Sequence, residues 1–449
     1  MENRNIFNYE LRGKTMKKVY IAIGADILHP GHINVINKGA EYGKVIVGLL
    51  SDEAIASYKR IPIYPFEVRK GIFSNLKNVS EVVKQETLDY TDNLRKIRPD
   101  YVVHGDDWRE GVQQLVRQKV IDVLKEWGGE LIEVPYTHGL SASEAHAEVT
   151  KDLKAPDYRR GLLKKMLHLK PFVTVMEASN GLSGLIVENT SVIDKETGLP
   201  KSFDAMWISS LCDSTFKGKP DIELVDLTSR LNTINEIMEV TTKPIILDGD
   251  TGGKVEHFVF NVKTLERIGV SAIIVEDKTG LKKNSLFGTD VEQKLEDPET
   301  FAHKIRSGKQ ALTTRDFLIF ARLESLIAGK DVDDAMMRAK LYVEAGADGV
   351  MIHSKNKTGE DIFEFIRRFR EYSKDIPIVL VPTSYNQFTE KELAEKGANI
   401  IIHANHLLRA AYPAMVKAAE TILENGRSKE ADEFCLPIKK VLRLIPGGE

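Results

Sequence analysis

The sequence predicts an α/β protein with two folded parts, a parallel sheet near the N-terminus and a (β/α)8 barrel of the TIM type after it. Three observations lead to this prediction. Apolar runs of strand length alternate with helical stretches, which is typical of parallel sheets. The alternation breaks once, at a charged helical stretch over 147–169, and eight apolar runs follow it. Eight β/α units within roughly 250 residues are the count of such a barrel.

The composition is that of an ordinary soluble globular protein. The chain has 449 residues, 42% of them hydrophobic and 29% charged, and its net charge of -3 gives no sign of a nucleic-acid partner. No apolar run approaches the roughly 18 residues of a membrane span, and the first residues lack the apolar core of a signal peptide. The two cysteines, Cys212 and Cys435, form neither a disulfide framework nor a metal motif. We therefore expect a cytoplasmic protein.

The expected domains follow from the points where the alternation stops and restarts. Residues 1–15 are polar and are predicted to be a flexible tail. The first folded domain is expected over 16–146, and a helical linker over 147–169. The barrel, together with C-terminal helices, is expected over 170–449.

In the first domain, a short turn suggests a phosphate site. Strands are expected in "KKVYIAIGA", "KVIVGLLSDE", "VSEVVKQE", "NLRKIRPDYVVHGDD" and "ELIEVPYT". The turn "HPGH", from His29 to His32, follows the first of these and opens a helix. Free N–H groups and the dipole of a helix N-terminus attract phosphate. Two histidines there can contact a nucleotide triphosphate.

In the barrel, polar side chains gather at the ends of the predicted strands. These strands are "FVTVMEA", "AMWISSL", "KPIILDGD", "SAIIVED", "FLIFARLE", "DGVMIHS", "IPIVLVPT" and "ANIIIHAN". The polar residues at their C-terminal ends are Glu177, Ser209, Asp248, Asp250, Glu276, Asp277, Arg322, His353, Thr383 and Asn405. Active sites of these barrels lie at that face. Exposed loops alone would also make strand ends polar, but charge directly abutting runs as apolar as "AIIV" favours a catalytic mouth.

Two neighbouring strand ends predict a metal and an anionic substrate. Asp248 and Asp250 end one strand, and Glu276 and Asp277 end the next. Such carboxylates suit Mg²⁺, a hard cation that prefers oxygen ligands. The following loop bears Lys282, Lys283, Asn284 and Ser285. It can close over a phosphoryl group and exclude water.

The order of these motifs matches a known family. The segments "MEASNGLSGLIVE", "MWISSL", "LDGDTGG", "EDKTGLKKNSLF", "ARLESLIAG", "HSK", "VPT" and "ANHLLRA" run from about Val173 to Ala411. The chain here resembles the phosphoenolpyruvate mutases of the isocitrate lyase superfamily. The resemblance implies Mg²⁺, a last helix exchanged between subunits of a dimer or tetramer, and interconversion of phosphoenolpyruvate and phosphonopyruvate. That reaction makes the carbon–phosphorus bond of phosphonate biosynthesis.

The resemblance also implies roles for the carboxylates. Asp250 would hold Mg²⁺, and Asp248, Glu276 and Asp277 would support the ion through water. Asp221 matches an aspartate of the family near the reacting centre.

The remaining residues would bind the substrate. Its carboxylate and enolate oxygen would be held by Ser209 and by backbone N–H groups near Ser210 and Leu211. Trp207 would wall the site, and Ser285 would contact substrate from the loop.

Four further residues are matched to the phosphoryl group. Arg322 and His353 would bind it, and Lys282 and Asn284 would close over it from the loop. The alternatives are a plain salt bridge between Arg322 and Glu324 and a structural role for His353 in the core.

Rivals within the superfamily differ in the same loop. The lyases carry a cysteine base there, whereas this loop reads "KTGLKKNS". Phosphonopyruvate hydrolases typically have threonine where this chain has Asn284, which favours the mutase. The alternative is a phosphonopyruvate hydrolase barrel with a non-catalytic N-terminal domain.

The first domain resembles the glycerol-3-phosphate-type cytidylyltransferases over about residues 17–144. The resemblance rests on "DILHPGHINVINKGAEYGKVIVGLLSDE", "PFEVRK", "VVHGDDW" and "THGLSAS". It implies a Rossmann-like sheet that binds CTP with Mg²⁺ and transfers CMP to an acceptor, here a phosphonate such as 2-aminoethylphosphonate. The implied nucleotide-binding residues are Asp26, His29, His32, Lys59, Arg69, Gly139 and Ser141.

This domain departs from the pattern at three positions. Gly24 is shifted by one place relative to the histidines, Tyr136 replaces an arginine, and Ala142 replaces a hydroxyl residue. The alternative is therefore a domain that binds nucleotide or supports assembly without catalysis.

Overall fold

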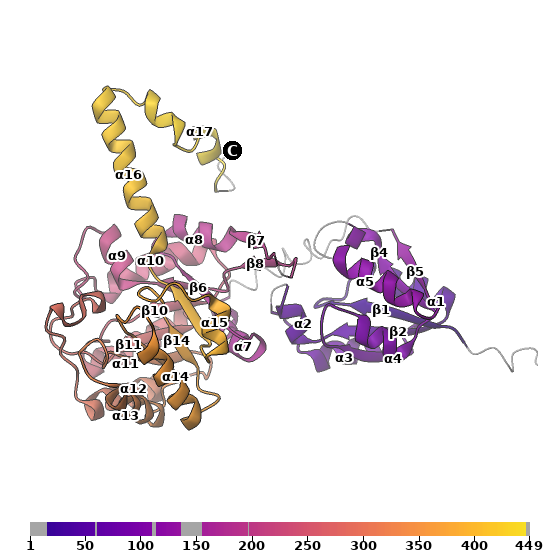
Figure 1. Ribbon diagram of the computed structural model, residues 1–449, viewed down its shortest axis with the longest axis horizontal. Coiled ribbons are helices and arrows are strands. Elements are labelled where there is room, and N and C mark those ends of the chain that lie inside the picture. The colour runs from indigo at the N-terminus through magenta and orange to yellow at the C-terminus, as the bar shows by residue number, and fades with distance from the viewer. Residues whose placement is uncertain (1–15, 59–60, 110–113, 136–154, 196, 446–449) are drawn as a thin grey trace, which may run out of the picture. The chain divides into compact units, whose positions relative to one another are not determined.

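The computed structural model describes residues 16–58, 61–109, 114–135, 155–195 and 197–445 (Figure 1). The chain divides into two compact units. The N-terminal unit comprises residues 1–173 and 189–203, and the barrel unit comprises 174–188 and 204–449.

The N-terminal unit is built on a five-stranded sheet in the order β3-β2-β1-β4-β5. The strands are β1 (Lys18–Ile23), β2 (Lys44–Leu50), β3 (Glu81–Gln85), β4 (Tyr101–Gly105) and β5 (Glu130–Val134), and all neighbours pair in parallel. The described helices are α1 (Pro30–Tyr42), α2 (Asp52–Ala56), α3 (Phe66–Ser74), α4 (Thr91–Ile97), α5 (Gln114–Lys125), α7 (Pro156–Leu169) and the 3-10 turn η1 (Asp106–Arg109). The strand order reverses between β1 and β4. Open α/β sheets bind ligands at such a switch point, and α1 begins there.

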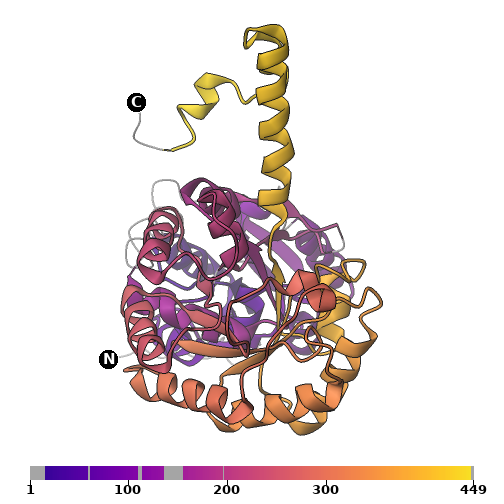
Figure 2. The ribbon, with the colours of Figure 1, turned by 90° about the vertical axis from the view of Figure 1, so that its left-hand side faces the viewer.

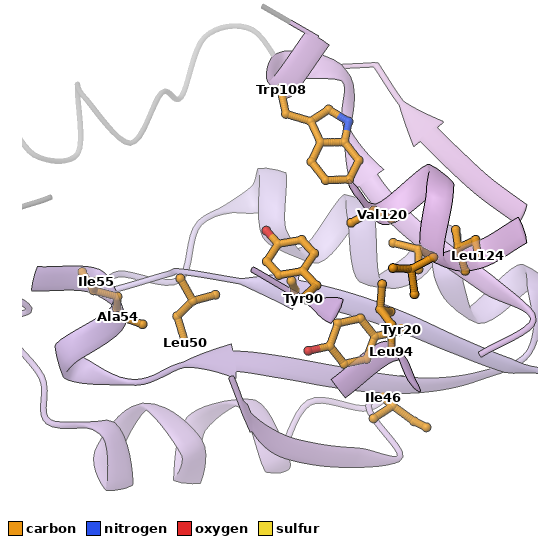
Figure 3. Packing of buried hydrophobic residues seen from close by; sticks show 13 residues of the cluster. Tyr20, Ile46, Leu50, Ala54, Ile55, Tyr90, Leu94, Trp108, Val120 and Leu124 are labelled. Atoms are coloured by element: carbon orange, nitrogen blue, oxygen red, sulfur yellow. The ribbon is translucent and has the colours of Figure 1, made fainter. Parts of the chain in front are cut away.

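Apolar layers cover both faces of this sheet because successive side chains of a strand point to opposite sides. Val19 and Ile21 of β1 pack in one layer with Phe73. Tyr20 packs in the other layer with Trp108 (Figure 3). The alternation along β1 thus fixes the sheet between two sets of helices, and the predicted parallel α/β domain is confirmed.

The barrel unit is a closed eight-stranded barrel in the order β10-β11-β12-β13-β14-β15-β6-β9. Its strands are β6 (Val173–Glu177), β9 (Ala205–Ile208), β10 (Ile245–Asp248), β11 (Ala272–Glu276), β12 (Leu318–Leu323), β13 (Gly349–Ile352), β14 (Ile378–Leu380) and β15 (Ile400–His403). Each lies in a predicted apolar run, so the predicted (β/α)8 barrel is confirmed. A hairpin of β7 (Ser191–Ile193) and β8 (Pro200–Ser202) was not predicted, because its residues are exposed and carry no apolar pattern.

Helices surround the barrel and place each following strand. They are α8 (Gly181–Asn189), α9 (Ser210–Phe216), α10 (Leu227–Val240), α11 (Val255–Ile268), α12 (Pro298–Ala311), α13 (Val332–Glu344), α14 (Glu360–Tyr372) and α15 (Glu390–Glu395). Aspartate side chains cap several of their N-termini, as Asp226 does for α10 and Asp331 for α13. The caps fix where the loops at the C-terminal face of the barrel end.

The last long helix, α16 (His406–Asn425), projects away from the barrel (Figure 2). The carboxylate of Glu177, at the end of β6, accepts a hydrogen bond from the Leu408 N–H at 2.7 Å and anchors the helix base. None of the twenty residues of α16 is buried in the described chain, and a 3-10 turn η4 (Lys429–Glu433) and α17 (Ile438–Val441) follow. The exchange of this helix between subunits stays a prediction. No helix in the described ranges combines the length and apolarity that crossing a membrane requires.

Candidate active site

A cavity opens at the C-terminal end of the barrel strands, and the predicted residues converge on it. All five residues predicted as catalytic line it, and so do all five predicted to bind substrate: Asp221, Lys282, Asn284, Arg322, His353, Trp207, Ser209, Ser210, Leu211 and Ser285. Of the four predicted metal carboxylates, Asp248 lines the cavity. The structure therefore brings together side chains from segments that lie far apart in the sequence.

Asp248 is the last residue of β10, and Asp250 lies two residues later in the turn that follows the strand. Asp248 Oδ2 accepts hydrogen bonds from the Ser210 N–H at 3.2 Å and the Ser210 hydroxyl at 2.9 Å. Asp250 has a φ of 51°, a left-handed backbone that is rare for a residue with a side chain and is often found at functional sites. Burial raises the pKa of Asp248, but Lys282, Arg322 and Arg230 outweigh it and lower the pKa to about 2.

The ammonium of Lys282 lies at the centre of these carboxylates. Its Nζ contacts an oxygen of Asp250, lies 2.9 Å from Asp221 Oδ1, and donates to the Ser210 hydroxyl at 2.8 Å. Burial lowers the pKa of Lys282, but Asp250 and the other nearby carboxylates raise it well above the usual range. Lys282 is therefore charged, and its ammonium lies between the carboxylate oxygens of Asp250 and Asp221.

These oxygens fit Mg²⁺ by their chemistry. The oxygens of Asp250, Asp221 and Ser210 already surround one cation, the Lys282 ammonium, and Asp248 stands beside them. In the described ranges, no group of three or more His, Cys, Asp or Glu side chains is placed to hold a metal ion. Mg²⁺ commonly binds one or two carboxylates and keeps several waters, so this donor set suits it.

Arg322, at the end of β12, is fixed by acidic partners. Its Nε lies 2.5 Å from Glu324 Oε1, and its Nη2 lies 3.4 Å from Glu276 Oε2 and donates to the Ser285 hydroxyl at 2.7 Å. His353 Nδ1 lies 3.2 Å from the same Glu324 oxygen. Burial, followed by the charge of Arg322, lowers the pKa of His353, so the imidazole is neutral near pH 7.

Glu276 and Asp277 are adjacent, so their side chains point to opposite sides of β11. Glu276 faces Arg322, and burial raises its pKa to about 7 despite this arginine. Asp277 Oδ2 instead accepts hydrogen bonds from Arg338 at 3.1 Å and Tyr342 at 2.9 Å, both on α13. Asp277 Oδ1 also accepts from the Glu324 N–H at 2.9 Å, so Asp277 joins the ends of β11 and β12 to α13 and makes no contact with Asp248 or Asp250 in the described ranges.

Residues 279–294, which we call the gating loop, are closed over the cavity. The amide of Asn284 donates to Asp221 Oδ2 at 2.6 Å. The Ser285 hydroxyl donates to Glu324 Oε2 at 2.6 Å and accepts from Arg322. Its only proton is therefore committed to Glu324 rather than to a substrate.

The N-terminus of α9 provides the other wall. Ser209 caps the helix, with its hydroxyl accepting from the Cys212 N–H at 3.4 Å. The Leu211 N–H belongs to the first helical turn, whose amides have no acceptor within the helix. Trp207, in β9, lines the same wall and is 2% exposed. Such a helix start suits an anion.

The predicted nucleotide site of the N-terminal unit is only partly described. His29 caps α1, its Nδ1 accepts from the Gly31 N–H at 3.2 Å, and the His29 N–H donates to His32 Nδ1 at 3.3 Å. The centroids of the two imidazole rings lie 3.7 Å apart. The Asp26 carboxylate accepts from the Ile63 N–H at 2.8 Å and so anchors another loop.

The Arg69 side chain is buried rather than extended into solvent. It is 1% exposed, pairs with Asp52 at 2.6 Å, and donates to the Tyr64 carbonyl at 3.0 Å. Its Nη1 is buried and has no hydrogen-bond partner within the described ranges. Lys59, Gly139 and Ser141 lie outside the described residues.

Comparison with known proteins agrees with this arrangement. A family model for phosphoenolpyruvate phosphomutase matches residues 163–423, more than half of the chain. The chain belongs to the phosphoenolpyruvate phosphomutase family. A cytidylyltransferase-like family model matches residues 24–160.

Two known proteins are similar to this chain. A phosphoenolpyruvate phosphomutase of Tetrahymena pyriformis is 35% identical over 283 residues, 63% of this chain and 89% of the relative. A phosphonopyruvate hydrolase of Variovorax sp. (strain Pal2) is 34% identical over 273 residues, 60% of this chain and 89% of that one.

Two solved structures are also similar to this chain. The phosphoenolpyruvate phosphomutase from Streptomyces platensis subsp. rosaceus superimposes with a TM-score of 0.56 at 31% identity and covers 63% of this chain and 93% of its own. A phosphonopyruvate hydrolase in complex with oxalate and Mg²⁺ gives 0.53 at 32% identity and covers 61% and 89%.

Three charged residues beside the cavity were missed or undervalued in the sequence. Glu324 was considered only as a salt-bridge partner, yet it contacts Arg322, His353 and Ser285. Its position two residues after Arg322 was the signal, since both point to the same side. Lys278, which directly follows Glu276 and Asp277, contacts the carboxylates of Glu276 and Glu324. Arg230, which contacts Asp250 at 3.1 Å, lies within α10, where the sequence gave no signal.

Proposed function

We propose that the barrel interconverts phosphoenolpyruvate and phosphonopyruvate, and that the N-terminal unit transfers CMP from CTP to a phosphonate such as 2-aminoethylphosphonate. One observation carries the first proposal: Asn284 and Lys282 of the closed loop meet Arg322 and His353 around one cavity. The protein would then act in phosphonate biosynthesis in the cytoplasm.

The proposed reaction is an isomerisation. The oxygen–phosphorus bond of phosphoenolpyruvate breaks, the pyruvate enolate forms, and the enolate carbon captures the phosphoryl group. No proton or water is gained or lost. Phosphoryl transfer through a loose transition state is promoted mainly by positioning and charge stabilisation.

The pyruvate half of the substrate would rest on the start of α9. The Leu211 N–H can hold its carboxylate, the Ser210 N–H can join it by exchanging its present acceptor, Asp248, and Trp207 can restrict its orientation. Mg²⁺, held by Asp250 with the support of Asp248, would supply positive charge to stabilise the enolate. Lys282 would yield its place among these carboxylates and remain beside them as a second positive charge.

The phosphoryl half would face Arg322, His353 and Asn284. Arg322 is preorganised by Glu324 and Glu276, so little reorganisation is needed when charge develops on the phosphoryl oxygens. Asn284 can donate an amide hydrogen bond to the phosphoryl group from the gating loop. A closed loop keeps water from the phosphorus during transfer.

The second candidate is a phosphonopyruvate hydrolase, which the relative from Variovorax sp. supports. In that case water, rather than the enolate carbon, would take the phosphoryl group. The purified full chain should be incubated with phosphonopyruvate and Mg²⁺, and phosphoenolpyruvate and pyruvate should be assayed separately. Formation of phosphoenolpyruvate supports the mutase, and stoichiometric pyruvate supports the hydrolase.

The proposed cytidylyl transfer is supported by the family match and the histidine pair at the start of α1. A phosphonate oxygen would attack the α-phosphorus of CTP, and pyrophosphate would leave. His29 and His32 can stabilise charge on the triphosphate. Pyrophosphate release that requires both CTP and 2-aminoethylphosphonate tests this proposal. Tight CTP binding without pyrophosphate release with any phosphonate would favour the non-catalytic alternative.

We also propose a homo-oligomer, a dimer or tetramer, in which α16 is exchanged between subunits. Apolar side chains of this helix stand exposed, with Tyr412 at 67% and Leu423 at 85%. Light scattering of the full chain tests the proposal. A monomer at micromolar concentration would contradict it.

A further inference from the structure

Lys278 joins the barrel to the gating loop. It follows β11 by two residues and is 2% exposed. Its ammonium lies 3.3 Å from Glu276 Oε1 and 3.4 Å from Glu324 Oε2, carboxylates at neighbouring strand ends. The same ammonium donates to the Lys283 carbonyl at 2.9 Å and the Ser285 hydroxyl at 3.0 Å. One buried charge therefore contacts both the rigid sheet and the loop.

The two ends of the loop are fixed by backbone hydrogen bonds. The Thr279 N–H donates to the Lys294 carbonyl at 2.9 Å, and the Glu296 N–H donates to the Asp277 carbonyl at 2.9 Å. This narrow neck ties both ends of the loop to the barrel. The part between the ends must be held by other contacts, and Lys278 stands where that part begins.

Apart from Lys355, whose ammonium donates to the Phe287 carbonyl at 3.0 Å and pairs with Asp290 at the exposed edge of the loop, the main contacts that hold the loop belong to the substrate site. Lys282 and Asn284 bind Asp221, and Lys282 also binds Asp250. These contacts must rearrange when metal and substrate enter. Lys278 is not among the described residues that line the cavity, so its contacts can persist with or without substrate.

Opening of the loop would separate Lys278 from its loop partners. A buried ammonium is costly unless hydrogen-bond acceptors and opposite charges surround it. The hydrogen bonds of charged groups are also stronger than those between neutral groups. The closed loop is therefore favoured by a charge that the barrel holds in place.

We propose that Lys278 is a positioning residue that holds the gating loop closed during phosphoryl transfer and thereby keeps water from the phosphorus. The proposal rests on the proposed mutase function. Lys278 touches no reacting atom and acts through the carbonyl of Lys283 and the hydroxyl of Ser285.

Four variants of the full chain test this role. Lys278→Met removes the ammonium and keeps most of the side-chain length, and Lys278→Arg restores a positive charge. Gln293→Leu removes a weaker partner of Lys278, 3.4 Å from the ammonium, together with the hydrogen bonds that the Gln293 amide donates to the Asn284 and Gly288 carbonyls. Lys283→Met is the matched control, because its side chain makes none of the ion pairs found in the described ranges.

The first readout is amide hydrogen exchange of peptides from 279–294 without substrate, which reports loop opening. Lys278→Met should exchange about tenfold faster than wild type, Lys278→Arg and Gln293→Leu should lie between them, and Lys283→Met should stay within about twofold. The second readout is the share of phosphonopyruvate converted to phosphate, measured by ³¹P NMR. The share of phosphate should be largest for Lys278→Met, intermediate for Lys278→Arg and Gln293→Leu, and close to wild type for Lys283→Met.

Wild-type exchange in a folded Lys278→Met protein would overturn the proposal. So would a slower reaction with unchanged exchange and an unchanged phosphate share, because Lys278 would then act only on the carboxylates. If Lys278→Met does not fold, wild-type exchange in Gln293→Leu overturns it. If the wild-type enzyme forms neither phosphoenolpyruvate nor phosphate, the mutase function fails, while the exchange readout still decides whether Lys278 holds the loop.

Discussion

The barrel mouth and the start of α1 are both proposed to bind phosphoryl groups, but they hold their charged side chains differently. At the barrel mouth, Arg322 and Lys282 are 7% and 4% exposed and are paired with strand-end carboxylates. At the start of α1, His29 and His32 are half-buried and hydrogen-bond to backbone groups and to each other.

The difference concerns when charge is put in place. The barrel fixes its charges before substrate arrives, which is the arrangement that stabilises a transition state most. The helix start offers N–H groups and the dipole, which attract phosphate without a fixed cation. We therefore expect single substitutions to cost more activity at the barrel mouth than at the helix start.

The largest effect is expected from Asp250→Ala. Loss of the proposed Mg²⁺ ligand should slow phosphonopyruvate conversion about 1000-fold, or ~4 kcal/mol, because a metal contributes several kcal/mol of charge stabilisation. Asp290→Ala, an exposed change in the gating loop whose carboxylate pairs with Lys355, is the matched control. Rates from ³¹P NMR that are equal in the two variants would place the metal elsewhere.

A smaller effect is expected from Asn284→Ala. One hydrogen bond to a charged group is worth about 1.5–3 kcal/mol, so the rate should fall roughly 10- to 100-fold while substrate binding changes less. Asn284→Thr, which imitates the hydrolase pattern, should divert part of the phosphonopyruvate to phosphate. A wild-type rate for Asn284→Ala would show that the loop does not control transfer.

At the helix start, His32→Ala should slow CMP transfer only about tenfold, since the backbone N–H groups of α1 remain. The mutase rate of the same protein should stay within about twofold, because its residues lie in the other unit. Pyrophosphate release and phosphonopyruvate consumption, measured on one preparation, check this. A loss as large as that of Asp250→Ala would contradict the proposed difference between the sites.

The smallest effect concerns pH and stability. Burial raises the pKa of Glu276 to about 7, so between pH 5 and 7 the folded state keeps a proton that the unfolded state has released. Stability from this group is therefore full at low pH and falls as pH rises. The free energy of unfolding should drop by about 1 kcal/mol between pH 6 and 7 in wild type relative to Glu276→Gln. Parallel urea-unfolding profiles would contradict the raised pKa.

The alternation of side chains along a strand explains part of what the sequence could predict and part of what it could not. Strand positions followed from apolar runs such as "AIIV", and polar residues directly after them marked the mouth. Asp248 and Asp250 approach one site, although Asp250 lies in the turn beyond β10. Glu276 and Asp277 were both predicted to support the metal, but they are adjacent and their side chains have different partners. Applying the two-residue period to that pair would have assigned Asp277 to the helix side.

Other features depend on contacts that a single sequence does not display. Arg230 reaches Asp250 from the interior of α10, where a charged residue normally indicates a solvated face. Ser285 carries a polar side chain into the cavity, but its proton is used by Glu324, which only the folded loop reveals. The sequence predicted which strand ends carry the site, whereas the partners of each charge depended on packing.

The barrel is proposed to move a phosphoryl group between oxygen and carbon while water is excluded. The most direct test is a ³¹P NMR time course of phosphonopyruvate with the purified full chain and Mg²⁺. We predict a phosphoenolpyruvate resonance that grows as phosphonopyruvate falls, with inorganic phosphate a minor product throughout. Phosphate as the main product from the first time points would contradict the claim and identify the barrel as a hydrolase.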